Sequence, residues 1–200
     1  MNKSQTNIIV IEDDERFRGS AVLFLIGMHY ETVKFCLTMA EGIAFLTSHL
    51  DEKNIIILDY QLSQGEMGNE VLHVIRKDIS KLVPVIFWTA NTIQEIAEII
   101  SDKTYAVVSK TESSETLLSI IKQAENELNH TIEGALEEWL VLEKGISVDP
   151  YLIKVSKQEL TIKEILNELR LQTPTGQKFE KNLLMLTIDL LLRRKEKLND

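Results

Sequence analysis

Short apolar runs recur along the first half of the chain, and each of them ends in a polar residue. The run at residues 8–11 ends at Glu12, and the run at residues 55–58 ends at Asp59. Unbroken runs of this length, rich in β-branched residues, are typical of strands that are buried on both faces of a parallel sheet. Further apolar runs predict strands at residues 83–88 and 106–108, and residues 32–35 alternate between polar and apolar like a strand.

Between these strands, apolar residues recur at spacings of three and four, which predicts helices. The predicted helices cover residues 16–28, 40–50, 71–79 and 93–100, and another begins near Glu115 after a serine cap. Strand and helix therefore alternate five times. We expect an α/β fold, namely a doubly wound five-stranded parallel sheet with right-handed crossovers. Such a fold brings the carboxyl ends of its strands to one edge of the sheet.

Polar residues that could bind a ligand or take part in a reaction follow these strand ends. They are Glu12, Asp13, Asp59, Thr89 and Lys110. Three carboxylates from two strands form an all-oxygen site, which favours Mg²⁺ over zinc. A lysine ammonium can neutralise a phosphoryl oxygen, and a hydroxyl can donate a hydrogen bond to another. Phosphoryl transfer asks a protein for little more than this positioning and neutralisation. Asp59 is then the candidate nucleophile, and it would form an aspartyl phosphate.

Four segments resemble the response regulator receiver domain of two-component signalling, which has the CheY-like, flavodoxin-like fold. They are IVIEDDE at residues 9–15, ILDYQL at 57–62, PVIFWTA at 84–90 and VSK at 108–110. The resemblance covers about residues 5–129. It is specific because five chemically distinct positions recur in order at strand ends.

The resemblance implies a role for each site residue. Asp59 would accept a phosphoryl group from a sensor histidine kinase or a phosphotransfer protein. Asp13 and Asp59 would bind Mg²⁺ directly, Glu12 would act through water, and the backbone carbonyl of Gln61 would complete the protein ligands. Thr89 would contact the phosphoryl group, and Lys110 would pair with it. Such a protein is a phosphoacceptor and not an enzyme, beyond self-catalysed phosphotransfer and dephosphorylation.

Three positions depart from the family pattern. Thr111 and Ser63 stand where the family often has proline. Val107 stands where the family usually has its switch aromatic, and Tyr105 is the nearest aromatic before it. The residues of phosphorylation are therefore intact, whereas the residues that pass its effect onward differ.

The remainder of the chain predicts an all-helical region. Apolar residues at spacings of three and four, from Leu117 to Leu142, fit either one continuous helix over residues 114–144 or two helices that meet near residues 130–134. Thr161 and Glu164 have the spacing of a capping box that starts a helix, and a turn at residues 173–176 is expected to stop it. A last helix is predicted over residues 179–198, with an apolar surface so broad that it implies burial in a bundle or dimer.

Two domains follow from this pattern, a receiver at residues 1–129 and a helical output or interaction domain at residues 130–200.

The composition of the chain limits which functions are expected. The net charge is −9 overall but +3 over residues 151–200, so bulk charge does not direct the first domain to nucleic acid. A single cysteine, Cys36, excludes a disulfide framework. Neither a membrane-spanning run nor a secretory signal is present, so we expect no membrane insertion and a cytoplasmic location.

The expected function is that of a response regulator in a phosphorelay, which relays phosphorylation of Asp59 to a helical output that binds a protein partner or forms a homodimer. Two alternatives stay open. One is a transcriptional regulator that binds DNA through the C-terminal helices. The other is a scaffold that keeps the receiver fold without being phosphorylated.

Overall fold

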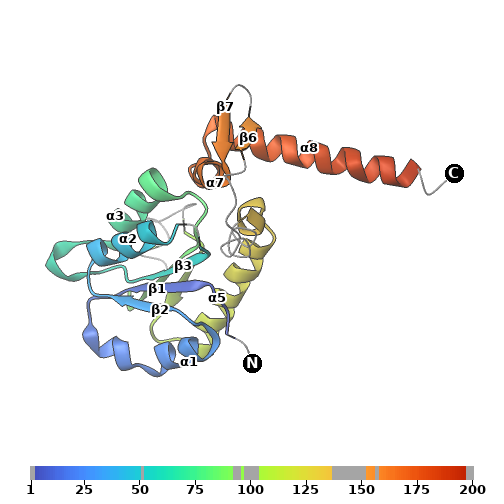
Figure 1. Ribbon diagram of the computed structural model, residues 1–200. Helices are drawn as coiled ribbons and strands as arrows, with labels where there is room; N and C mark the ends of the chain where they lie inside the picture. The colour runs from blue at the N-terminus through green and yellow to red at the C-terminus, as the bar shows by residue number, and fades with distance from the viewer. Residues whose placement is uncertain are drawn as a thin grey trace.

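The computed structural model describes residues 3–50, 52–91, 96, 104–136, 152–155 and 158–196. Its first part contains a five-stranded parallel sheet in the order β2–β1–β3–β4–β5. Figure 1 labels β1, β2 and β3 of this sheet. The strands are β1 (Asn7–Ile11), β2 (Val33–Cys36), β3 (Asn54–Leu58), β4 (Val85–Thr89) and β5 (Ala106–Ser109). The predicted doubly wound sheet is confirmed, and strand order reverses between β1 and β3.

Helices cover both faces of this sheet, which explains why the central strands β1, β3 and β4 are almost entirely apolar. Side chains at alternating positions, such as Ile9 and Ile8, point into two separate core clusters. The helices α2 (Met39–Ser48) and α3 (Gly68–Val74) pack on the first cluster. The helices α1 (Ala21–His29) and α5 (Ser114–Asn129) pack on the second. A strand covered on both faces needs no polar face.

Some predicted helix boundaries were wrong. Residues 16–28 do not form one helix, because a 3₁₀ turn, η1 (Glu15–Gly19), precedes α1. The Ser20 hydroxyl accepts a hydrogen bond from the Leu23 amide and caps α1, and Gly27 lies inside that helix. The helix α3 continues into a π-helical turn, η3 (Ile75–Ile79). The predicted helix at residues 93–100 lies outside the described residues, except for Ile96, which is fully buried.

The long helix over residues 114–144 was also wrong, and the alternative of two helices is confirmed. The helix α5 ends at Asn129, and the Thr131 hydroxyl accepts a hydrogen bond of 2.9 Å from the Gly134 amide as a new helical stretch begins at residue 132. Gly134 is required there because a Cβ atom would collide with the carbonyl of Leu128. The chain therefore breaks three residues before the glycine. Residues 137–150 lie outside the described part.

The described residues from 158 to 196 include the helices α7 (Ile162–Arg170) and α8 (Pro174–Glu196), as predicted in kind. The capping box is confirmed, since the Thr161 hydroxyl accepts from the Glu164 amide at 3.2 Å and Glu164 accepts from the Thr161 amide at 2.7 Å. The turn predicted at residues 173–176 instead opens α8, because the Thr173 hydroxyl caps it through the Gly176 amide.

An antiparallel hairpin, β6 (Leu152–Val155) and β7 (Gln158–Thr161), precedes these helices. The sequence left its first strand ambiguous, and the region is therefore mixed, not all-helical. A small third core, separate from the two clusters of the sheet, joins Val155, Ile165, Leu169 and Phe179. Ile132, which follows the break after α5, packs against this third core.

The C-terminal region meets the sheet at the edge where the strands begin. The Lys81 amide, just before β4, donates a hydrogen bond of 2.7 Å to the carbonyl of Arg170 at the end of α7. The Arg170 side chain donates to Glu133 at 2.9 Å, and both side chains are only 6% exposed. This junction lies at the edge opposite to Asp59.

Candidate functional site

The three carboxylates predicted from the sequence lie together where β1 and β3 end. Ile11 and Leu58 are partners in adjacent strands, so Glu12 and Asp59 emerge side by side. The Asp59 amide donates to the carbonyl of Ile11 at 3.0 Å, which fixes this register. Carboxylate oxygens of Glu12, Asp13 and Asp59 lie within 4.8 Å of one another.

Lys110 reaches this cluster from the end of β5. Its ammonium lies 2.5 Å from Glu12 Oε2 and 2.8 Å from Asp59 Oδ2. The lysine side chain is only 10% exposed, and that of Glu12 only 2%. Charges removed from water this far need close partners, and a single ammonium serves both carboxylates.

The ionised form of Glu12 is electrostatically unfavourable in this arrangement. Burial raises the pKa of Glu12 above its usual range, and the nearby Asp59 charge adds to this effect. The hydrogen bond from Lys110 opposes both. A buried pair of carboxylates that relies on one lysine is a site that a further cation would stabilise.

Thr89 ends β4 and is fully buried. Its carbonyl accepts a hydrogen bond of 2.7 Å from the Lys110 amide, so the two residues are adjacent at the sheet edge. The Thr89 hydroxyl contacts Asn91, whose amide donates to it at 3.2 Å. Gln61, two residues after Asp59, is exposed and forms a backbone bridge to Met67.

Asp14 turns away from the cluster. It caps the turn η1 and pairs with Arg16, whose Nε lies 2.8 Å from Asp14 Oδ1. The hydrogen bond from Arg16 lowers the pKa of Asp14 to about 2. The sequence IVIEDDE thus supplies two site carboxylates and one helix-capping carboxylate.

Two aromatic residues that the sequence reasoning missed complete the site. The Lys110 ammonium lies 4.4 Å from the centre of the Phe17 ring and 5.5 Å from the Trp88 ring. The two rings meet edge to face, with centroids 5.2 Å apart. An ammonium is attracted to the face of an aromatic ring, so these rings hold the lysine at the carboxylates. The position of Trp88, one residue before Thr89, is the feature of the sequence that could have indicated its place beside the site.

Gly68 is a third residue whose role was missed. A Cβ atom at this position would collide with the carbonyl of Asp59 and come within 2.7 Å of the Phe87 ring. The Gly68 amide donates to the carbonyl of Tyr60 at 2.8 Å. The start of α3 can therefore approach the strand that carries Asp59 because this residue has no side chain.

The position of the switch aromatic is occupied by Val107, as read from the sequence. Tyr105 is tied elsewhere, because its hydroxyl donates a hydrogen bond of 2.8 Å to Glu127 on α5. Burial, and then that bond, raise the pKa of Tyr105 to about 12. Aromatic contact at the site comes from Phe17 and Trp88 instead.

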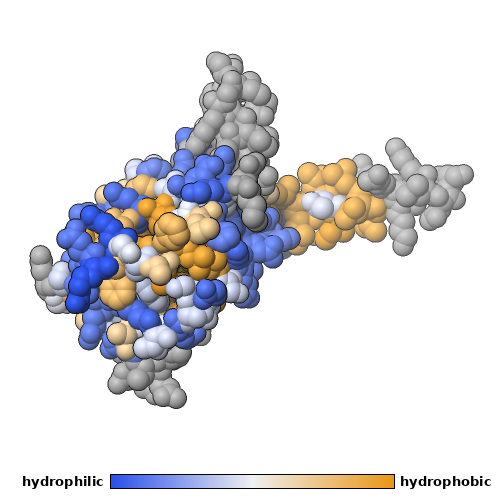
Figure 2. All heavy atoms as spheres, turned by 90° about the horizontal axis from the view of Figure 1, so that it is seen from below, coloured by the Kyte–Doolittle hydropathy of each residue, from blue (hydrophilic) through white to orange (hydrophobic). Residues whose placement is uncertain are grey.

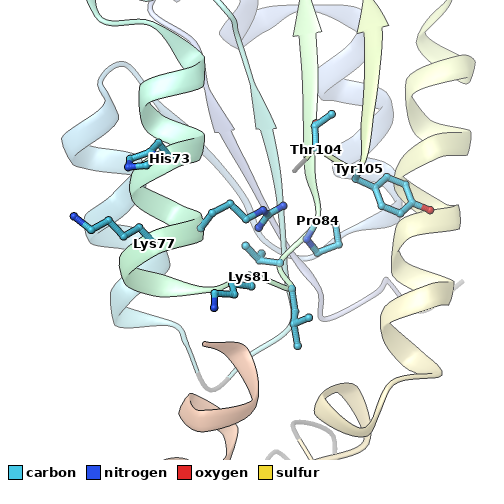
Figure 3. Close-up of a pocket in the computed structure, with 9 residues that line it drawn as sticks. His73, Lys77, Lys81, Pro84, Thr104 and Tyr105 are labelled. Carbon is cyan, nitrogen blue, oxygen red and sulfur yellow. The ribbon is translucent and has the colours of Figure 1, made fainter. Parts of the chain in front are cut away.

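A separate cavity of about 450 Å³ lies at the opposite edge, where β4 and β5 begin. Figure 3 shows Pro84, Thr104 and Tyr105 on the strand side of this cavity. The Arg76 guanidinium also lines it and donates to the Ser80 carbonyl at 3.1 Å, and burial lowers the pKa of Arg76 to about 10. The nine described residues that line it include no carboxylate, and none of them belongs to the acidic cluster.

The chemistry of the acidic edge is that of a nucleophilic carboxylate beside a cation-binding cluster. Asp59 offers oxygens held by Lys110 and by the Tyr60 amide, the latter at 2.7 Å. The donor atoms of Glu12, Asp13 and Asp59 are all hard oxygens. Hard oxygens suit Mg²⁺. The fold and this site together define a receiver of the two-component type.

Comparison with known proteins identifies the family. Residues 8–122 match the response regulator receiver domain, more than half of the chain, and the protein belongs to this family. None of the curated proteins matches the sequence.

Solved structures agree in fold. A response regulator receiver domain protein from Clostridium thermocellum has a TM-score of 0.54 and 20% identity, over 62% of this chain and 96% of that one. The receiver domain of an HD domain-containing protein from Pseudomonas fluorescens Pf-5 has a TM-score of 0.53 and 21% identity, over 62% and 97%. A CheY-like receiver protein from Methanospirillum hungatei JF-1 has a TM-score of 0.52 and 23% identity, over 62% and 96%. These likenesses establish the fold of the first part alone.

Proposed function

We propose that this protein is a response regulator whose Asp59 accepts a phosphoryl group from a sensor histidine kinase or a phosphotransfer protein. The observation that carries the proposal is the Lys110 ammonium, held between Glu12 and Asp59 beside Asp13. An Asp59 oxygen attacks phosphorus, and the bond from phosphorus to the donor breaks as the new bond forms. Lys110 then neutralises a phosphoryl oxygen, and the Thr89 hydroxyl donates to another.

The donor set fits Mg²⁺. Asp13 and Asp59 would hold the ion directly, Glu12 would act through water, and the carbonyl of Gln61 would complete the protein ligands. The ion, when bound, supplies positive charge to the phosphoryl oxygens. The close approach of the carboxylate oxygens of Glu12, Asp13 and Asp59, within 4.8 Å of one another, supports this assignment.

Incubation with Mg²⁺ and a small phosphodonor tests the proposal. We expect the intact mass to rise by one phosphoryl group, and we expect a chelator to abolish the gain, because the carboxylate cluster needs the cation. Peptide mapping should place the group on Asp59. An unchanged mass with Mg²⁺ present would favour a scaffold that is not phosphorylated.

Replacing Phe17 tests how Lys110 is positioned. The variant Phe17→Leu loses a cation–π contact worth roughly 1 kcal/mol, so we expect phosphorylation from the same donor to slow about fivefold. Phe17→Tyr keeps the ring and should restore the rate. Equal rates for Phe17→Leu and the wild type would show that the ring does not position Lys110.

The output is proposed to reside in residues 130–200, with the receiver at residues 1–129. The separate third core, to which Ile132 contributes, supports this division. We propose that this helical region contacts a protein partner or a second copy of the chain. The protein would act in the cytoplasm as a phosphoacceptor, with only self-catalysed phosphotransfer and dephosphorylation.

DNA binding is the second candidate, favoured by the short connection between α7 and α8, which end and begin at Arg170 and Pro174. The very apolar surface of α8 counts against a groove-binding helix. Steep salt-dependent binding of the full chain to duplex DNA would support it, and no binding at low salt would exclude it.

A further inference from the structure

The helix α8 exposes an apolar surface that the described part of the chain leaves uncovered. Of the nine residues from Leu184 to Leu192, seven are large apolar residues that are 44–62% exposed. Figure 2 shows this segment as a projecting rod of apolar residues, and Figure 1 shows it extending away from α7. A helix that is apolar all round is normally enclosed by protein or lipid.

The exposed apolar area of α8 is larger than the largest patch on an ordinary monomer. At roughly 100 Å² for each side chain, the seven expose about 700 Å² around the helix. The largest apolar patch on an ordinary monomer is about 300–600 Å². Within the described residues, no helix is both long and apolar enough to span a bilayer.

The order of residues along α8 makes the surface complementary to itself when two copies run antiparallel. The residues from Leu183 to Leu192 read LLMLTIDLLL, which is nearly symmetric about the bond between Thr187 and Ile188. Leu184, Ile188 and Leu191 lie on one face of the helix, at spacings of four and three. A two-fold axis at this bond sets Leu184 against Leu191, and Thr187 against Ile188, of the second copy.

We propose that α8 is a self-association helix and that its partner is α8 of a second copy, antiparallel around Thr187 and Ile188. The apolar contact is isologous, as expected for a two-fold dimer. This inference deepens the output role in the proposed function, but it requires no phosphoryl group on Asp59. Failure of one can therefore be told from failure of the other.

The oligomeric mass of the full chain, measured by light scattering without phosphodonor, tests the proposal. We expect a dimer at micromolar concentration. In the proposed register position 184 faces position 191 of the partner, so Leu184→Glu with Leu191→Glu should weaken association at least about 100-fold. The same positions changed to lysine should also give a monomer. A mixture of the two variants should restore a dimer, because opposite charges then face each other.

A control variant removes apolar surface elsewhere. Phe24 and Met28 on α1 are 74% and 58% exposed, and Phe24→Glu with Met28→Glu should leave the dimer intact. A wild-type chain that stays monomeric overturns the proposal, and binding of that monomer to phosphatidylglycerol vesicles would assign α8 to a lipid surface. A dimer that survives both changes in α8 also overturns it.

Discussion

Asp59→Asn is expected to take no phosphoryl group from any donor, whereas the wild type takes one. The amide oxygen of asparagine can still accept the hydrogen bond that the Tyr60 amide donates to Asp59 at 2.7 Å. Lys110 keeps its other partner, Glu12, at 2.5 Å. The substitution also removes the repulsion between Asp59 and Glu12. The free energy of unfolding should therefore change by no more than about 1 kcal/mol, and the loss can be assigned to chemistry.

The measurement is intact mass after incubation with Mg²⁺ and a small phosphodonor. Asp14→Asn is a matched control, because Asp14 lies one residue from the site but pairs with Arg16. That variant should be phosphorylated at the wild-type rate. An undiminished phosphoryl adduct on Asp59→Asn would show that another residue is the acceptor. Loss of the adduct in both variants would show that the local charge matters and not Asp59 itself.

The acidic site could be predicted from the sequence because parallel strands impose it. Once strands 8–11 and 55–58 are placed side by side, the residues that follow them must meet at one edge. The meeting of Glu12 with Asp59, and of both with Lys110, needs no knowledge of side-chain packing. The register Ile11 to Leu58 then reproduces it.

The aromatic contacts could not be predicted in the same way. Phe17 reaches Lys110 from the short turn η1, which ends before α1 begins, and the apolar spacing of residues 16–28 does not reveal that interruption. Trp88 has the same apolar character as its neighbours in β4. The alternation of side chains along β4 indicates on which face of the sheet Trp88 lies. Its contact with Lys110, which follows β5, depends on three-dimensional packing.

The end of α5 was undecidable for a related reason. The spacing of apolar residues continues across the break, since Ile132 follows Leu128 by four positions, although the two side chains enter different cores. The break is set by the Thr131 cap and by the close approach of Gly134 to Leu128. The spacing of apolar residues predicts that a residue is buried, but not which core it packs into.

The buried pair of Glu133 and Arg170 supports the second large prediction, since it ties the two parts of the chain together. Removing one member of a buried ion pair leaves an uncompensated charge and costs about 3–5 kcal/mol. Arg170→Met should therefore lower the free energy of unfolding by this amount at neutral pH. Glu133→Leu combined with Arg170→Met removes both charges, and it should lie within about 1 kcal/mol of the wild type.

The pH dependence identifies the cause. Burial raises the pKa of Glu133, and Arg170 opposes this rise. A raised pKa in the folded state means that stability is full below the ordinary glutamate range and is lost as the pH rises through the folded value. Without Arg170 the pKa rises further, so the deficit of Arg170→Met should be large near pH 8 and small near about pH 5. Urea unfolding of both variants and the wild type at each pH measures this difference. A deficit that is the same at both pH values would assign the loss to packing of the arginine stem, and not to the buried charge of Glu133.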